Sequence, residues 1–421
     1  MVKAAALFYS LAISFLITLI SSSLILFAYF SRHEVESSLQ LEKARINCQS
    51  GMNILLAGKS EIPSCGEGDL DLFGDGQETV HLRRLQWGIF EIGISKGSVG
   101  KYSQTLAALL GAKLGSDNNL ALVVADHDKP LSLCGKTFIK GLCYLPVAGV
   151  KRAYIEGQSF TGDKLIDGEV RTSDSKLPPV NPEIIDGNSR YMNGEYAETD
   201  SIIDFEKMDD NDSISNSFLN KTLVMKSTGP IEVINKKYSG NIRLVSGSNI
   251  FISSMAELSD VILYAPIVEI EKGFTGTIQV FASDTLIVNE DVKLIYPSAA
   301  GVIGLEKNKG GKIWLGKNTL AEGVIFAYSE NGGGKNPVWV SVDKDAIIKG
   351  ILFCSGMVEM KGSVYGTIIC DKFILTTPSS VYENNLLNAT VDASRLSVHF
   401  AGADILESFA VKKERNIVKW L

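Results

Sequence analysis

Hydrophobic positions follow three successive patterns along the 421 residues of this chain. The first is a continuous apolar run, because no charged residue occurs between Lys3 and Arg32. In the second, from about residue 34 to residue 60, apolar residues recur at roughly helical spacing, and no proline precedes Pro63. In the third, from about residue 131 onward, short apolar pairs alternate with polar positions, which is the period of a β-strand.

The apolar run predicts a membrane-spanning helix. Residues 4–31 extend over about 42 Å as a helix, compared with about 30 Å for the hydrocarbon core of a bilayer. Tyr9 and Tyr29 lie near its ends, where aromatic rings favour the membrane interface. A cleaved signal peptide, the alternative, has an apolar region of only about 7–15 residues followed by a small-residue cleavage site. We therefore expect an uncleaved anchor over residues 1–33, in the lipid bilayer through residues 4–31, continued by a stalk helix over residues 34–60.

The third pattern predicts short strands stacked in coils. The segment "GFTGTIQVFASDTLIVNEDVKLIYPS", from Gly273 to Ser298, holds short strand-like runs separated by turn residues. Glycine followed by apolar residues recurs, as at Gly323 and Gly350, and glycine is expected where a chain turns a tight corner. Ordinary sandwiches use strands of about 5–6 residues with longer loops. We therefore predict a mainly β fold, in which an N-terminal transmembrane and stalk α-helix is followed by a parallel, right-handed β-helix solenoid. An irregular antiparallel sandwich is the alternative.

Changes of pattern divide the chain into seven parts. The stretch after the stalk contains strand, turn and strand patterns, with Asp75-Gly76 as a hairpin turn. The stretch from Pro178 to Phe218 is acidic and polar, which indicates an insertion looped out of the solenoid. The predicted parts are a transmembrane anchor (1–33), a stalk helix (34–60), a small β-rich region (61–130), first solenoid coils (131–178), an acidic insertion (179–220), a β-solenoid (221–390) and a C-terminal cap or tail (391–421).

Net charge and cysteine content narrow the function classes. The formal net charge of −7 provides no basic surface for nucleic acid. The six cysteines form three pairs of near neighbours in the sequence, which suits disulfides in an oxidising compartment. Six free, buried thiols are the alternative. The candidate pairs are Cys48 with Cys65, Cys134 with Cys143, and Cys354 with Cys370.

Motifs for catalysis or metal binding are absent from the sequence. The segment "ENGGGKN" is not a phosphate-binding loop, because Asn336 stands where serine or threonine is needed. The four histidines are far apart in the chain, and no zinc motif occurs. Strand acids such as Glu269, Glu271 and Asp284 form no paired constellation. We therefore predict no catalytic residue, no metal site and no cofactor.

The N-terminal part of the chain resembles minor pilins and pseudopilins of the type IV pilus and type II secretion kind. Three features carry this resemblance: the apolar helix "AAALFYSLAISFLITLISSSLILFAYF", the polar exit "SRHEVESSLQLEKARIN" and the small-residue patch of "CQSGMNILLA". The chain departs from the family in two ways, since its N-terminus begins "MVKAAA" and no acidic residue precedes Glu34. The resemblance implies assembly with pilin-like partners through the helix.

A second resemblance concerns the repeat region. The segment "IIKGILFCSGMVEMKGSVYGTIIC" resembles the bactofilin and polymer-forming β-helix proteins in its recurring apolar and glycine turns. The resemblance covers about Leu320 to Leu375. It implies self-assembly through solenoid ends and brings no catalytic residue with it.

These observations predict a non-enzymatic, membrane-anchored envelope protein with a β-helix ectodomain. The resemblance to pseudopilins implies that it is a minor pseudopilin-like component of a pilus or secretion assembly. Expected partners are the bilayer and pilin-like or self-assembling proteins, with no nucleic acid. The alternatives are a bactofilin-like cytosolic scaffold and a carbohydrate-binding or carbohydrate-cleaving β-helix.

The expected location is the bacterial cell membrane, with a single pass and with the bulk of the chain periplasmic or extracellular. Lys3 precedes the apolar run and Arg32, Lys43 and Arg45 follow it, so the distribution of basic residues does not itself favour export of the bulk. The paired cysteines do favour export.

Overall fold

A computed structural model describes residues 2–58, 65–74, 76, 78–113, 119–207, 213–305, 310–330, 336–406 and 414–421, with side chains from residue 6 onward. The chain forms two compact units. The first, called the helix unit, comprises Met1–Leu55, Ser60–Arg84 and Gly93–Leu106. The second, called the stack unit, comprises Leu56–Lys59, Leu85–Ile92 and Ala107–Leu421.

The helix unit combines one long helix with a small sheet. Helix α1 (Val2–Leu56) continues without interruption for 55 residues, because neither proline nor a capping signal ends it earlier. The sheet has the order β1-β2-β3-β4, and β1 pairs antiparallel with β2. The expected turn residue Asp75, between β1 and β2, lies outside the described residues. The strands are β1 (Glu67–Asp71), β2 (Glu78–Trp87), β3 (Phe90–Val99) and β4 (Tyr102–Lys113).

The second half of α1 packs closely on this sheet. Ala44, Cys48 and Met52, one helical turn apart, are buried. Gly97 on β3 allows the close approach, since a Cβ atom there would lie 2.4 Å from the Ala44 carbonyl oxygen. Gly51 serves the same purpose from the helix, where a Cβ atom would lie 2.4 Å from Ser95 Oγ. The small-residue patch seen in the sequence is therefore where the helix meets its sheet.

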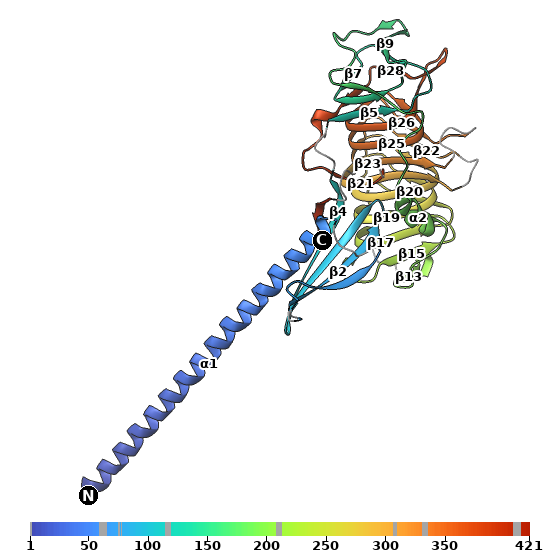
Figure 1. Ribbon diagram of the computed structural model, residues 1–421. Helices are drawn as coiled ribbons and strands as arrows, with labels where there is room; N and C mark the ends of the chain where they lie inside the picture. Colours follow the sequence, from blue (N-terminus) through green and yellow to red (C-terminus); the bar gives the residue numbers. More distant parts are fainter. Residues whose placement is uncertain are drawn as a thin grey trace. The chain divides into compact units, whose positions relative to one another are not determined.

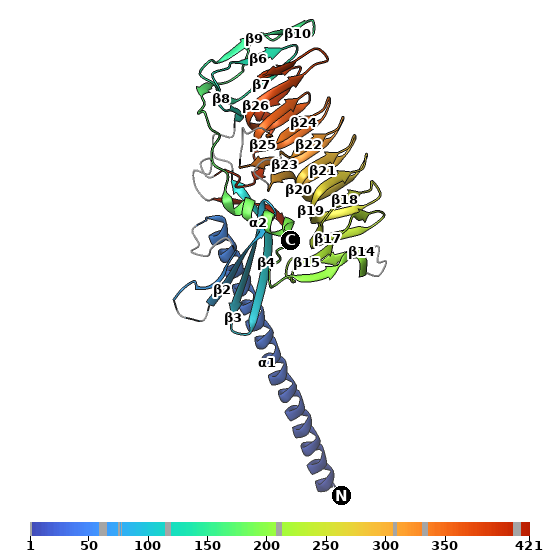
Figure 2. The same ribbon diagram turned by 90° about the vertical axis from the view of Figure 1, so that its right-hand side faces the viewer.

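The stack unit is dominated by parallel strands. From β15 (Leu223–Ser227) to β26 (Ser363–Thr376), successive layers of strands pair in parallel, and the path of the sheet closes on itself. Each such layer of strands is called a coil below. Figures 1 and 2 show the strands stacked one above another. A mainly β chain behind an N-terminal apolar helix is thus confirmed. The parallel pairing excludes the antiparallel sandwich for residues 237–373.

The other strands of this sheet are β5 (Leu120–Val124), β7 (Phe138–Lys140), β8 (Leu142–Leu145), β12 (Val170–Thr172), β13 (Ser201–Asp204), β14 (Ser213–Asn216), β16 (Ile231–Val233), β17 (Lys237–Ser246), β18 (Asn249–Ile252), β19 (Glu257–Ile270), β20 (Thr275–Val288), β21 (Lys293–Gly304), β22 (Lys312–Leu315), β23 (Leu320–Ser329), β24 (Trp339–Val342), β25 (Ile347–Met360), β27 (Val381–Glu383) and β29 (Thr390–Asp392). A three-stranded sheet has the order β28 (Asn385–Leu387), β6 (Leu131–Cys134) and β9 (Val150–Arg152), and β10 (Tyr154–Ile155) pairs with β11 (Gln158–Ser159).

Aliphatic side chains fill the interior of the stack in aligned columns. One column runs through Val280, Ala300, Ile325, Leu352 and Ile368, which are register partners on successive coils. All five are at most 1% exposed. Because parallel strands hold side chains of the same kind above one another, each coil buries its apolar row against its neighbours.

The order of the coils in space differs from their order in the chain. β5 pairs with β26, so that Leu122 lies opposite Ile368, and β7 pairs with β29. The early strands therefore lie on the last coil, next to β26. At the other end of the stack, β13 and β14 pair with β15 and β17. The segment expected to loop out over residues 179–220 thus supplies two strands of the sheet as well as helix α2 (Pro182–Met192).

The last two strands of the described chain join the sheet of β4. β30 (Ala401–Gly402) and β31 (Arg415–Trp420) pair antiparallel with the second half of β4. Arg415 forms a bidentate ion pair with Glu91, with distances of 2.6 and 2.8 Å. Because both side chains are largely buried, this pair fixes the end of the chain.

Candidate membrane and assembly surface

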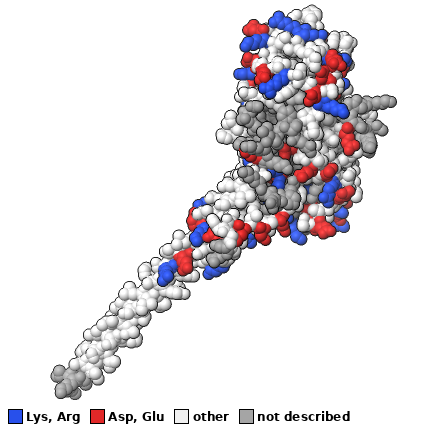
Figure 3. Space-filling view, viewed as in Figure 1, with Lys and Arg blue, Asp and Glu red and all other residues white. Residues whose placement is uncertain are grey.

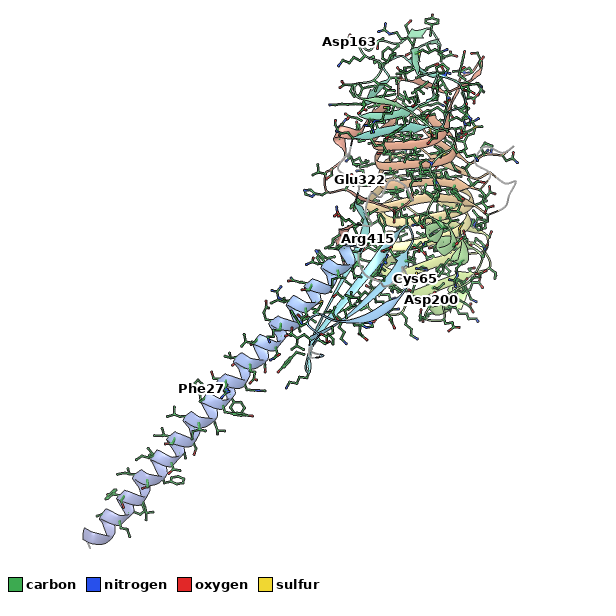
Figure 4. All side chains as sticks on the ribbon, viewed as in Figure 1. Phe27, Cys65, Asp163, Asp200, Glu322 and Arg415 are labelled. Carbon is green, nitrogen blue, oxygen red and sulfur yellow. The ribbon has the colours of Figure 1, made fainter. Side chains whose placement is uncertain are left out.

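The first half of α1 presents an apolar surface to its surroundings. Its most apolar 18-residue window has a mean hydropathy of 2.3, and none of that window is buried. Phe8, Phe15 and Phe27 are 70–72% exposed, and Phe27 projects from the helix in Figure 4. In Figure 3 this half of α1 shows neither basic nor acidic atoms on the visible face. Among the described residues, α1 is the one helix that is long and apolar enough to cross a membrane. An N-terminal signal sequence meets the same criteria of length and composition.

Two hydroxyl groups in this segment donate hydrogen bonds to the helix backbone. Ser10 Oγ donates to the Leu7 carbonyl oxygen at 2.9 Å, and Thr18 Oγ1 donates to the Ser14 carbonyl oxygen at 2.8 Å. A hydroxyl bonded to a preceding backbone carbonyl needs no water as partner. These side chains therefore suit lipid or a neighbouring helix as surroundings.

Polar contacts begin where the apolar run ends. Tyr102 donates its hydroxyl hydrogen bond to Ser37 Oγ at 2.7 Å. Glu78 accepts a hydrogen bond from Asn47 at 2.8 Å and pairs with Lys43 at 3.6 Å. On the exposed side of the helix, Arg45 bonds to Glu42 through two contacts of 2.6 and 2.9 Å. The second half of α1 is therefore held by its own sheet, whereas the described side chains of the first half, up to Ser31, are apolar or carry only a hydroxyl group.

The structure places the six cysteines in different surroundings. All six are free thiols here; Cys65 is exposed and the other five are buried. Cys48 and Ser95 exchange hydrogen bonds through Cys48 Sγ and the Cys48 carbonyl oxygen. Cys354 and Cys370 are register partners on β25 and β26. Burial raises the pKa of the Cys354 thiol to about 12 and that of the Cys370 thiol well above its usual value. The three disulfides remain predictions.

The strand acids singled out in the sequence do not lie around one site. Glu269 accepts a hydrogen bond from Asn289 at 3.0 Å. Glu271 accepts from the Ser254 backbone nitrogen and from the hydroxyls of Ser253 and Ser254, and these bonds lower its pKa, the backbone one most. Within the described residues, no group of three or more His, Cys, Asp or Glu side chains is arranged to hold a metal ion.

Sequence patterns did not indicate a buried polar cluster in the stack unit, called the Arg243 cluster (Trp87, Asn188, Tyr191, Arg243 and Tyr264). The Arg243 guanidinium carbon lies 3.8 Å from the Tyr191 ring centre and 5.1 Å from that of Trp87. Tyr264 donates to Asn188 Oδ1 at 3.0 Å, and burial raises the pKa of Tyr264 to about 12, so its hydroxyl stays protonated. The cluster brings together β17, β19, α2 and the end of β2. These four elements are distant in sequence, and no local pattern connects them.

Comparisons with known proteins identify no family for this chain. No protein-family model matches it, and no curated protein matches it. Among solved structures, it is similar to the competence-associated pilin ComZ from Thermus thermophilus, with 10% sequence identity and a TM-score of 0.26, over 91% of this chain and 97% of that one. A TM-score this low does not establish a common fold. No comparison supports the resemblance to bactofilins.

Proposed function

We propose that this protein is a non-enzymatic, membrane-anchored envelope component of the pilin-like or pseudopilin-like kind. The single observation that carries the proposal is the division of α1 into two halves. One half packs on the antiparallel sheet through Ala44, Cys48 and Met52, while the described side chains of the other half are apolar or carry only a hydroxyl group. A helix of this kind is held in place at one end and offers lipid-like contact at the other.

The stack then serves as a rigid domain displayed by this helix. We infer that it is a right-handed β-solenoid, since its strands pair in parallel coil by coil and parallel crossovers are right-handed in about 98% of cases. Backbone hydrogen bonds along successive coils would make it a spacer or an interaction surface.

Substituting Ile17 by lysine tests the anchor. A charge near the centre of a membrane helix costs about 2.5–3.5 kcal/mol, so we expect the variant to shift from the membrane pellet to the alkaline-extractable fraction. The matched control is Leu41→Lys, at an exposed leucine in the half of α1 beyond the apolar run, which should stay with wild type. Equal extraction of both variants would remove the support for the bilayer as partner of this half.

Orientation follows from labelling Cys65, the exposed thiol. If the bulk of the chain is exported, a membrane-impermeant maleimide will label Cys65 in intact spheroplasts, and Cys65→Ser will abolish the signal. Labelling only after lysis would favour the bactofilin-like cytosolic alternative. Reductant is included in a parallel sample, because a Cys48–Cys65 disulfide would block the reagent. Mass-spectrometric mapping of all three predicted disulfides accompanies the assay, and fully free thiols would count against export.

Membership of a pilus or secretion assembly needs a separate measurement. We expect the chain to be recovered with sheared surface fibres or cross-linked to pilin-like subunits through α1. If the chain stays monomeric in the membrane during fibre assembly, it is not part of the fibre, and α1 serves only as a membrane anchor.

A further inference from the structure

One side of the stack carries a row of outward-pointing side chains on six successive coils, and all but one of them are at least partly exposed. The strands concerned are β18, β19, β20, β22, β24 and β25, and each pairs in parallel with the next. The side chains that point inward on these strands are buried, while the alternate positions point outward. Five spacings of about 4.8 Å give the row a length of about 24 Å.

Each of the six coils places one large apolar side chain next to one hydrogen-bonding side chain on this side. We call these twelve residues the outer strip. In coil order the pairs are Phe251 with Asn249, Ile267 with Glu269, Ile287 with Thr285, Trp314 with Lys312, Trp339 with Ser341, and Met357 with Glu359. Glu359 is buried and pairs with Lys361 at 2.9 Å, so the row of accessible hydrogen-bonding groups ends at Ser341.

The two tryptophans form the centre of the outer strip. Trp314 is 52% exposed and Trp339 is partly exposed, on neighbouring coils. Trp314 has Ile287 as its register partner on one side, and Trp339 has Met357 on the other. Large apolar side chains left in solvent on consecutive coils serve no purpose in the interior of the stack, so they indicate a ligand.

The arrangement favours a linear sugar chain over a protein. A protein interface gathers its apolar residues in a core and places polar residues at the rim, whereas the outer strip alternates the two kinds on every coil. Addition of a β-strand from a partner is excluded here, because the backbone groups of these strands are already paired. A sugar ring has an apolar face and hydroxyls at its edge, and therefore matches one apolar and one hydrogen-bonding side chain per coil.

We propose that the outer strip binds an extended, β-linked polysaccharide lying along the stack. Tryptophan rings pack on the apolar faces of the sugars, and side chains such as Lys312 and Ser341 bond to their hydroxyls. The site is a binding surface. It uses residues of the stack unit only, and does not depend on the role proposed for α1.

The test uses the full chain in phospholipid nanodiscs, since glycoside detergents would compete for the strip. Cellohexaose and chitohexaose are titrated while tryptophan fluorescence is followed, with cellobiose as a short competitor. We expect saturable binding of at least one hexaose, at least tenfold weaker binding of cellobiose, and at least a tenfold loss of affinity in both Trp314→Ala and Trp339→Ala. Trp314→Phe should retain part of the affinity.

Trp420→Phe is the matched control, because Trp420 is 53% exposed and lies outside the strip. It should bind like wild type. The proposal is overturned if neither hexaose binds to the folded wild-type protein, or if Trp314→Ala binds as wild type does. It is also overturned if the tryptophan substitutions abolish self-association of the chain without any effect of sugar, which would assign the strip to a second copy.

Discussion

Gly350→Ala is expected to lower the free energy of unfolding by about 3 kcal/mol or more, the largest effect of any single methyl group in the stack. Two costs add at this position. Gly350 has a φ of 145°, which side chains rarely adopt. A Cβ atom there would also lie 1.9 Å from the Gly323 carbonyl oxygen on the neighbouring coil. Backbone cannot move aside as a flexible side chain can, so the coils must separate.

The same contact recurs at successive corners. A Cβ atom at Gly366 would lie 2.0 Å from the Gly350 carbonyl oxygen, and one at Gly323 would lie 2.0 Å from that of Ser298. The corners between the coils are therefore packed backbone against backbone. The glycines at these corners, Gly323, Gly350 and Gly366, allow the coils to stack this closely. We therefore expect the stability of the stack to be most sensitive to substitution at these positions.

Two control variants separate the two costs. Gly273 has a φ of 83° but open space around it, so Gly273→Ala measures the conformational cost alone, about 1 kcal/mol. Gly356 lacks the unusual φ, but a Cβ atom there would lie 2.3 Å from the Val338 carbonyl oxygen, so Gly356→Ala measures the contact. Urea midpoints of the full chain, followed by far-ultraviolet circular dichroism, compare the three. If Gly350→Ala lowers the free energy of unfolding no more than Gly273→Ala does, the backbones at the corners are not closely packed.

Several features of the fold follow from local sequence. The charge-free run before Arg32 specifies an apolar helix whatever the rest of the chain does. Alternation such as that of Leu286 and Val288 with polar neighbours specifies strands with one buried face, and both residues are buried. Glycine before an apolar residue marks corners, as Gly323 and Gly350 show. These signals act over a few residues, and a single sequence contains them.

The order of the coils does not follow from such signals. Every coil has the same inward apolar pattern, so the pattern identifies Leu122 as an inward residue but not Ile368 as its partner. The pairing of β5 with β26 joins segments far apart in the chain, which a signal acting over a few residues does not specify. The outer strip could not be predicted from the sequence for a related reason. Trp314 and Trp339 occupy alternate positions of strands, and only the register shows that they are neighbours on the outside.

The Arg243 cluster shows what long-range contacts add to the outer surface of the stack. Tyr264 and Phe281 are outward-facing neighbours on β19 and β20, with ring centres 5.6 Å apart, and both are buried. Tyr191 on α2 stacks on Tyr264 with ring centres 5.5 Å apart. Gln279 bonds to the backbone of Trp87 and Ile89. One side of the stack is thus covered by segments from elsewhere in the chain, while on another side Trp314 in the outer strip is 52% exposed among the described residues.

Arg243→Ala is expected to release α2 from this side of the stack, with a local loss of about 2 kcal/mol. Arg243 is 5% exposed, stacks on Tyr191, and donates to the Gln86 carbonyl oxygen at 3.0 Å. A desolvated cation between two aromatic rings contributes about 2 kcal/mol, and its hydrogen bond to Gln86 holds the end of β2. Amide hydrogen exchange should accelerate about thirtyfold in α2, as 2 kcal/mol implies, and stay unchanged in β20 and β21.

Arg395→Ala is the matched control, since Arg395 also lies over an aromatic ring, 3.6 Å from the centre of Tyr365, but at an exposed position. Its loss should be no more than about 1 kcal/mol, because solvent weakens the interaction. Arg243→Lys should fall between wild type and alanine, since lysine keeps the charge but not the planar stacking. If exchange in α2 does not respond to Arg243→Ala, then the apolar contacts of Tyr191 and Ile184 hold the helix without the cation. In that case the buried charge costs the fold as much as it contributes.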